Sequence, residues 1–470
     1  MRSVAFCLVI VLGVTLVSNR LLQADSASVL IKDVPHVRQK PDFCGEACVA
    51  AWLQKLGSKA DQDAVFDQSG LDPTLGRGCY TKELDQAIRR FGFKTGPVWN
   101  RIKVADHERE LERHWSNMVT DLRRGVPSII CMRTRVQNGT EHFRLILGYD
   151  AKTDEVIYHE PAADDGAYHR MAKKKFMTLW PLQYDPQEWL VVRFALATET
   201  VPRLGSSTMP TSADYAQHIM QLKDRLPNKN FTVVLQHPFV VVGDEPESKV
   251  RSRAEHTVKW ATDKLKKQYF AKDPDQILDI WLFKDQSSYE SNALRLFNSK
   301  PSTPYGYYSP SDKALVMNIA TGGGTLVHEI VHPFVEANFP ECPSWFNEGL
   351  GSLYEQSNER DKKIIGMTNW RLAGLQRAIK AGNVPSFATL CSTTRKQFYN
   401  EDPGTHYAQA RYLCYYLQEH DLLGKYYHSF VVNHKTDPTG YKTLQQVLGT
   451  KDIPAFQKKW EAYVMTLRFR

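Results

Sequence analysis

The sequence predicts an α+β protein with two domains. At 470 residues the chain is too long for one ordinary hydrophobic core. Segments with helical periodicity and short apolar segments typical of strands occur in both halves. Between the halves, residues 198–215 carry two prolines, a glycine and several serines and threonines, as linkers do. We therefore expect a first domain at 29–197, a linker at 198–212 and a second domain at 213–470.

The first 28 residues are typical of a signal peptide. Arg2 supplies a positive charge, an apolar stretch of 13 residues runs from Ala5 to Val17, and small residues follow where a signal peptidase could cut. The stretch is shorter than the roughly 18 residues that a membrane span needs. We expect a secreted or periplasmic protein without stable membrane insertion after cleavage; an uncleaved N-terminal anchor is the alternative.

The composition is that of a folded soluble protein, with 42% hydrophobic and 24% charged residues. The net charge is +8, but 60 basic and 52 acidic residues are spread along the chain, and the densest basic run, at 173–175, is short. Zinc-finger spacing and RNA-binding aromatic motifs are absent from the sequence. We therefore expect no nucleic-acid partner.

In the first domain, the stretch CGEACVAAWLQKLG predicts a helix that begins at Cys44, with Gly57 as its C-cap. The stretch GVPSIICMRT indicates a buried strand, and a second strand begins near His142. A third strand, in DEVIYHEPA, follows a turn around Lys152 and Thr153. This order would bring His142 and Glu160 side by side in an antiparallel sheet.

These residues form a candidate catalytic set. A helix N-terminus stabilises an anion, so we expect a lowered thiol pKa at Cys44. His142 could act as the base, Glu160 could orient it, and Gln39 could donate an amide hydrogen bond to an oxyanion. The alternative is structural, because cysteines of exported proteins usually form disulfides.

The series Gln39, Cys44-Gly45, His142-Phe143, GYD and Glu160-Pro161 resembles the papain-like cysteine peptidases, and among them the bacteriocin-leader peptidase domains. The resemblance covers about residues 30–197. It implies Cys44 as nucleophile, His142 as base, Gln39 as oxyanion donor and Glu160 as orienter. The family usually has Asp where this chain has Glu160, so Asp164 and Asp165 are alternatives.

Seven cysteines remain after signal cleavage, so at least one thiol stays free unless it pairs between chains. We expect Cys44 to be free and Cys48 to be structural, with Cys79 as its partner. A bridge between Cys342 and Cys391 is the expected pairing in the second domain, although sequence alone does not fix connectivity.

In the second domain, the pattern predicts a helix near 213–226, strands within NFTVVLQHPFVVVGDE and a long helix from about 247 to 270. A strand follows at 277–283, and a hairpin at 305–320 turns at Pro310-Ser311-Asp312. From Gly324 onward the chain is expected to be mostly helical.

The stretch TLVHEIVHPFVEANFPECPSWFNEGLGSLYEQ carries a metal-binding pattern. His328 and His332 lie one helical turn apart, so both can bind one Zn²⁺. Glu329 faces an adjacent side, where it can take a proton from water. Glu348 follows sixteen residues after His332, beyond a turn-rich segment, and is the candidate third ligand. The alternative is a helix with two surface histidines, but the apolar neighbours of the motif predict burial.

Pro333 follows the motif directly and is expected to kink the helix or end its regular hydrogen bonding. HEIVH with WFNEG resembles the gluzincin metallopeptidases, in particular the peptidase MA-like group, over roughly residues 228–356. The resemblance implies a thermolysin-like zincin α+β core, with zinc on His328, His332 and Glu348 and with Glu329 as general base and acid. It also implies a role near the oxyanion for Tyr407, for which core packing is the alternative.

The leading hypothesis is an exported two-domain peptidase: a papain-like α+β domain followed by a thermolysin-like zincin domain with a mostly helical C-terminal part. Its partner would be a peptide or protein substrate and its cofactor Zn²⁺. One alternative makes the papain-like domain an inactive peptide-binding module. Another makes the whole chain an adhesion or scaffold protein with vestigial sites.

Overall fold

In the computed structural model, the chain forms two compact units, Met1–Gln221 and Leu222–Arg470. The structure describes residues 27–198, 209–401 and 403–469. The expected signal peptide lies almost wholly outside these residues, as does most of the expected linker. Among the helices of the described residues, none has the length and apolar character needed to cross a membrane.

The first unit is built around an eight-stranded sheet. Its main path is β2-β8-β3-β4-β5-β6, with β1 paired to β4 and β7 paired to β8. The strands are β1 Val29–Leu30, β2 Trp99–Lys103, β3 Ser128–Arg133, β4 Glu141–Asp150, β5 Glu155–His159, β6 His169–Ala172, β7 Leu182–Asp185 and β8 Glu188–Ala195. The three strands expected from the sequence are β3, β4 and β5, which are antiparallel neighbours.

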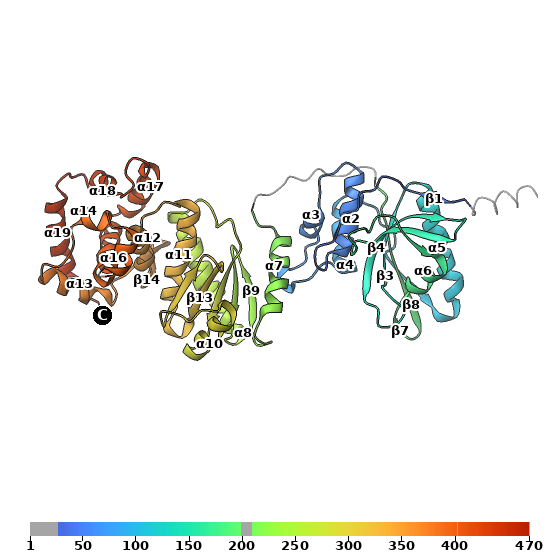
Figure 1. Cartoon of the computed structure of the whole chain (residues 1–470), viewed down its shortest axis with the longest axis horizontal. Coiled ribbons are helices and arrows are strands. Elements are labelled where there is room, and N and C mark those ends of the chain that lie inside the picture. The colour runs from blue at the N-terminus through green and yellow to red at the C-terminus, as the bar shows by residue number, and fades with distance from the viewer. Residues whose placement is uncertain (1–26, 199–208, 402, 470) are drawn as a thin grey trace, which may run out of the picture. The chain divides into compact units, whose positions relative to one another are not determined.

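Helices cover both faces of this sheet (Figure 1). Side chains along β3 alternate, so Ile129 and Cys131 enter one core while Ile130 and Met132 enter the other. The first face carries α2 Cys44–Lys55, α3 Gln62–Asp67 and α4 Thr81–Arg90; the second carries α5 His107–Arg123 and α6 Lys173–Leu179. Short 3-10 turns, η1 Pro73–Leu75 and η2 Val104–Asp106, complete the unit.

Helix α2 positions the candidate nucleophile. It begins at Cys44, as expected, and Gly57 follows its last turn with a φ of 84°, a conformation that glycine adopts without strain. Residues 45–53 are all buried, so α2 is enclosed by the first core on every side. Helix α7, Ser212–Arg225, spans the division between the units, and its Ala213 and Ala216 belong to the core of the first unit.

The second unit contains a five-stranded sheet in the order β12-β13-β11-β10-β9. The inner pairs β10–β11 and β11–β13 are parallel, whereas β9 and β12 are antiparallel to their neighbours. The strands are β9 Thr232–Gln236, β10 Phe239–Gly243, β11 Leu278–Phe283, β12 Gly306–Ser309 and β13 Ala314–Asn318. They confirm the strand and hairpin predictions for this part of the chain.

The expected long helix is continuous but not regular. It consists of α8 Glu247–Arg253, a π-helical turn η3 Ala254–Lys259 and α9 Trp260–Gln268. Helix α10 Gln286–Phe297 and the 3-10 turn η4 Ile319–Thr321 precede the two helices that carry the candidate metal ligands, α11 Gly324–Asn338 and α12 Ser344–Leu353.

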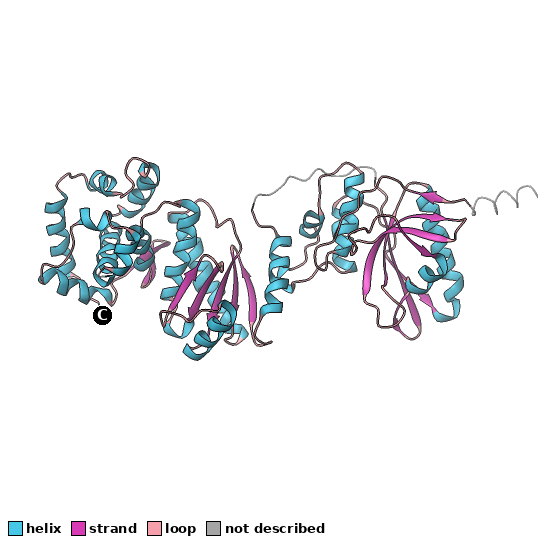
Figure 2. Cartoon of the chain, in the orientation of Figure 1, coloured by secondary structure: helices cyan, strands magenta, loops and turns pink. Residues whose placement is uncertain are grey.

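After α12 the described chain is helical except for one strand pair, β14 Ser357–Arg360 with β15 Lys363–Gly366 (Figure 2). The helices are α13 Arg371–Lys380, α14 Phe387–Cys391, α15 Arg395–Asn400, α16 Pro403–Glu419, α17 Leu423–Asn433, α18 Tyr441–Leu448 and α19 Ile453–Thr466. The predicted α+β class with a mostly helical C-terminal part is confirmed.

Pro333 lies inside the motif helix and does not end it. Helix α11 continues for five residues beyond it, to Asn338. Proline removes only the hydrogen bond from its own nitrogen to the Glu329 carbonyl. Phe334 and Val335, which follow the proline, are buried in the hydrophobic core of the second unit, and their packing stabilises the continued helix.

The expected disulfides are also absent: all seven described cysteines are free. The thiol of Cys79 hydrogen-bonds to the carboxylate of Glu46 instead of pairing with Cys48. The Sγ of Cys342 lies 3.7 Å from the Pro343 carbonyl, whereas Cys391 is buried on α14. These thiols are packed as small apolar side chains.

Candidate active sites

Helix α11 holds the two motif histidines together inside the second unit. The His328 and His332 rings lie one turn apart with centroids separated by 4.9 Å. The apolar residues between and around them pack into the core, so both imidazoles are largely shielded from solvent. One ligand atom each from His328, Glu329 and His332 lie within 4.8 Å of one another.

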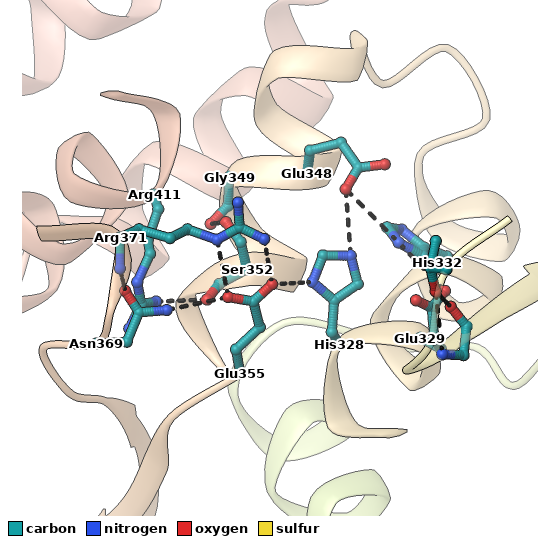
Figure 3. Close-up of polar contacts among 12 residues, drawn as sticks. His328, Glu329, His332, Glu348, Gly349, Ser352, Glu355, Asn369, Arg371 and Arg411 are labelled. Carbon is teal, nitrogen blue, oxygen red and sulfur yellow. Dashed lines mark hydrogen bonds and ion pairs between the residues drawn. The ribbon is translucent and has the colours of Figure 1, made fainter. Parts of the chain in front are cut away.

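Glu348 on α12 completes this group (Figure 3). Its Oε2 lies 3.2 Å from Nε2 of His328 and 3.9 Å from Nε2 of His332. Two atoms that each lie about 2.05 Å from a tetrahedral zinc ion are separated by ~3.3 Å, which is close to these distances. Oε2 is buried and has no hydrogen-bond partner. Two histidines and a carboxylate with a buried, unpartnered oxygen form a donor set that fits zinc.

Contacts on the outer side of each imidazole turn Nε2 toward Glu348. Nδ1 of His328 lies 3.3 Å from Oε1 of Glu355, and Nδ1 of His332 lies 3.0 Å from Oδ1 of Asn347. Because a carboxylate or amide oxygen accepts, an Nδ1 that carries a proton can donate to it, and the Nε2 of that ring can then offer its lone pair to a metal. Such partners are typical of metal-binding histidines.

Glu355 is itself held in place. Arg371 donates to both of its carboxylate oxygens, at 3.0 and 2.8 Å, and Asn369 donates at 3.0 Å. Burial opposes ionisation of Glu355, but hydrogen bonds from His328 and Arg371 lower its pKa to about 2. Arg411 donates to the Ser352 carbonyl and so fixes the end of α12 that precedes Glu355.

The contact between Glu355 and His328 yields a prediction. Glu355→Gln keeps the size of the side chain but removes the charge, so zinc affinity is expected to fall by about 10- to 100-fold. Competition with a chromophoric zinc chelator measures this change. The control is Glu359→Gln, an exposed carboxylate on β14 that pairs with Lys264. Equal zinc affinity in both variants would contradict a role for Glu355 in holding His328.

One glycine and two tyrosines shape the rest of the site. A Cβ on Gly351 would lie 3.2 Å from Nε2 of His328, so the glycine makes room for the imidazole. Tyr399 on α15 donates to Oε1 of Glu348 at 2.5 Å. Tyr407 on α16 also hydrogen-bonds to Glu348, and burial raises the pKa of Tyr407, so its hydroxyl stays protonated.

A cleft of about 550 Å³ opens onto these groups. His328, Glu329, His332 and Glu348 line it together with Tyr399 and Tyr407. The structure therefore brings all five residues predicted for this site, Tyr407 included, to one cleft. Sequence reasoning missed Tyr399, Glu355 and Asn347. Glu355 could have been found from the sequence, because it follows Glu348 by about two helical turns. Tyr399 lies in no recognisable motif.

In the first unit, the structure brings His142 and Glu160 together. Nε2 of His142 lies 2.5 Å from Oε1 of Glu160, and Arg144 donates to Oε2 at 2.7 Å. Burial opposes ionisation of Glu160, but the His142 hydrogen bond and the charges of His142 and Arg144 lower its pKa to about 2. The alternative orienters point elsewhere: Asp164 pairs with Arg38, and the carboxylate of Asp165 lies 3.9 Å from His169.

Cys44 and Gln39 each contact a residue that is adjacent in sequence to His142 or Glu160. The backbone N–H of Phe143, next to His142, hydrogen-bonds to the Cys44 thiol. The Gln39 backbone N–H donates to the Pro161 carbonyl at 2.9 Å, beside Glu160, while its side-chain oxygen is buried without a partner. The four predicted residues are thus carried by α2, the start of β4 and the segments that flank them.

The expected low pKa of Cys44 is wrong. Burial raises the pKa of this thiol to about 12, and the charges of Glu46 and Asp42 add to the effect. Hydrogen bonds from Phe143 and Gly45, at the helix start, lower it too little to compensate. Glu46, which sequence reasoning missed, is fully buried and accepts from the Cys79 backbone N–H at 2.7 Å. Desolvation outweighs the helix dipole here.

The raised pKa makes the reactivity of Cys44 testable. A thiol with a pKa near 12 is almost wholly protonated at pH 7, so its alkylation by iodoacetamide is expected to be slower than that of unfolded cysteine. The rate should rise about tenfold per pH unit up to the limit of native stability. Mass spectrometry of the Cys44 peptide measures it. Faster alkylation of native than of denatured Cys44 at pH 7 would contradict the prediction.

Comparisons with known proteins bear on the first unit. Residues 31–186 match the sequence profile described as "Peptidase_C39 like family". The first unit thus contains a cysteine-peptidase-type domain. Among solved structures, the peptidase domain of Streptococcus ComA, a bi-functional ABC transporter involved in a quorum-sensing pathway, is 17% identical. That match covers 35% of this chain and 98% of that chain, with a TM-score of 0.24. No curated protein matches the chain.

Proposed function

We propose that the chain is an exported peptidase whose second unit hydrolyses peptide bonds with a zinc ion held by His328, His332 and Glu348. The observation that carries this proposal is the buried Oε2 of Glu348, which faces both Nε2 atoms and has no hydrogen-bond partner. A buried carboxylate oxygen without a partner is costly, and a divalent cation at that point removes the cost. The metal-free alternative is a protonated His328 paired with Glu348, which leaves His332 without a close partner for Nε2.

The cleft residues have distinct roles in this proposal. Bound zinc would polarise the substrate carbonyl and lower the pKa of a water molecule. Glu329 takes the proton of the attacking water and delivers it to the leaving amine. The protonated hydroxyls of Tyr407 and Tyr399 line the same cleft, where Tyr407 donates to the oxygen that develops negative charge.

Cleavage of a complex peptide library by the full-length protein tests this proposal. Wild type and Cys44→Ala are each incubated before and after removal of zinc with 1,10-phenanthroline, and again after zinc is restored. We expect both proteins to cut the library, to lose cleavage with the chelator and to regain it with zinc. Cleavage that survives complete zinc removal in Cys44→Ala would contradict a zinc-dependent site.

The cysteine-peptidase-type domain suggests a second activity. The observation that favours it is the His142–Glu160 contact, in which Glu160 takes Nε2 and leaves Nδ1 for a thiol. The raised pKa of Cys44 instead favours the alternative, an inactive peptide-binding module that presents substrates. In the same library experiment, cleavage that persists in zinc-free wild type and disappears in Cys44→Ala would identify a thiol peptidase.

A further inference from the structure

The metal-site cleft contains one arginine and no lysine among the described residues that line it. That residue is Arg395, the first residue of α15. The carboxylates that line the same cleft are Glu329, Glu336 and Glu348. If zinc occupies the site, the charges of Glu348 and its neighbours are compensated by the ion, and Arg395 is then an uncompensated cation at the cleft wall.

Arg395 has no carboxylate partner anywhere in the described parts of the chain. Its guanidinium lies over the ring of Tyr399, with 5.7 Å from Cζ to the ring centroid, and its side chain is exposed. The hydroxyl of Tyr399 is the group that donates to Glu348. The ring of Tyr399 therefore lies between the Arg395 guanidinium and Glu348, a proposed metal ligand. At this position the guanidinium can reach groups that flank a peptide bond bound at the metal site.

The local backbone holds Arg395 at this position. Thr394 caps α15, and the side chain of Gln397 closes a capping box with the Thr394 backbone. The next residue, Lys396, is also exposed but does not line the cleft. Two adjacent cations on one short helix thus differ in whether they face the site.

The acidic side chain farther along the cleft is already engaged. Glu336 lies one turn beyond His332 on α11 and accepts from the hydroxyl of Tyr308 at 3.0 Å. Tyr308, Pro310, Glu336 and Pro340 also line an adjoining pocket of about 330 Å³, so the cleft continues past this contact. Of the charged groups in the cleft outside the metal site, Arg395 is the one without a hydrogen-bonded or ion-paired partner in the described residues.

We propose that Arg395 binds a carboxylate of the substrate next to the scissile bond, so that the second unit prefers peptides with an acidic group there. The inference rests on the proposed peptidase function and adds a specificity residue to it. The carboxylate can belong to a Glu or Asp side chain or to the peptide C-terminus. A guanidinium suits either, because its donors match both carboxylate oxygens.

Matched peptides test the proposal on the zinc-loaded full chain. One scanning set places Glu, Gln or Lys in turn on each side of the cleaved bond, and a second set ends in a free or an amidated C-terminus. For wild type, kcat/KM is expected to be about tenfold higher for Glu than for Lys at one position, with a smaller ratio at high salt. Arg395→Glu should invert this ratio, Arg395→Lys should keep its direction, and the control Lys396→Glu should leave it unchanged.

The two sets distinguish the source of the carboxylate. A preference confined to internal Glu assigns a side chain, and a preference confined to the free C-terminus assigns a terminal carboxylate; either outcome supports the inference when Arg395→Glu inverts it. The same ratios in wild type and Arg395→Glu would overturn it.

Binding provides a readout that does not need cleavage. Fluorescence anisotropy with zinc-loaded Glu329→Gln measures Kd for the same peptides, with and without Arg395→Glu. Equal Kd values for Glu and Lys peptides in both proteins would overturn the inference. Selective binding without any cleavage by wild type would support the inference and contradict the proposed peptidase function, so the two failures are distinguishable.

Discussion

Replacing Glu329 with glutamine is expected to lower kcat for peptide hydrolysis by about 10²- to 10⁴-fold while zinc stays bound. Glutamine has the size of glutamate but does not accept a proton from water. Glu329 lines the cleft and its Oε2 lies 3.8 Å from Nε2 of His332, so its carboxylate borders the proposed metal position without being one of the three ligands. Steady-state kinetics on a cleaved library peptide, with zinc assayed on the same preparation, measures the effect.

Glu336→Gln is the matched control for this variant. Glu336 lies on the same helix and lines the same cleft, but its carboxylate is engaged by Tyr308. We expect its kcat to stay within about threefold of wild type, as for a carboxylate outside the proton-transfer step. Wild-type kcat in Glu329→Gln, or equal losses in both variants, would contradict the assignment of Glu329 as the base.

Replacing Glu348 with glutamine is expected to abolish stoichiometric zinc binding. The substitution removes the charged oxygen toward which both histidine Nε2 atoms point, and two imidazoles alone hold zinc weakly. Equilibrium dialysis should give a Kd at least about 100-fold higher than in wild type. A second readout is thermal: zinc should raise the Tm of wild type, because it binds only the folded state, and leave that of the variant unchanged.

An exposed carboxylate in the loop between α11 and α12 provides the control for Glu348→Gln. Glu341→Gln alters a side chain between α11 and α12 that lies 3.5 Å from His434 and outside the metal group. It should bind zinc as wild type does. One equivalent of zinc bound to Glu348→Gln with unchanged affinity would show that the ligands lie elsewhere.

The residues proposed to bind zinc or to react were the most predictable part of the second unit, because the structure brings them to one cleft. Helical geometry alone places His328 and His332 on one face, and the turn-rich segment before α12 lets Glu348 return to them. The strands β9 to β13 were predictable too, because they are short apolar segments bounded by turn residues. In both cases the signal is local in the sequence.

Features that depend on the assembled fold were not predictable. Tyr399 reaches Glu348 only because α15 packs beside α12, across 51 residues of chain. The pKa of Cys44 was misjudged because a helix start is visible in the sequence, whereas the enclosure of α2 and the neighbouring Glu46 are not. The disulfides were misassigned for the same reason, since pairing depends on distances that spacing does not encode.

X-ray absorption spectroscopy at the zinc edge, on full-length protein purified without chelators, can show whether the second unit binds zinc through His328, His332 and Glu348. We expect one zinc per chain with nitrogen and oxygen neighbours at about 2.0–2.1 Å and the scattering pattern of two imidazoles. The signal of both imidazoles should be lost in a His328→Ala, His332→Ala double variant. Absence of zinc, or sulfur neighbours at about 2.3 Å, would contradict a site built from His328, His332 and Glu348.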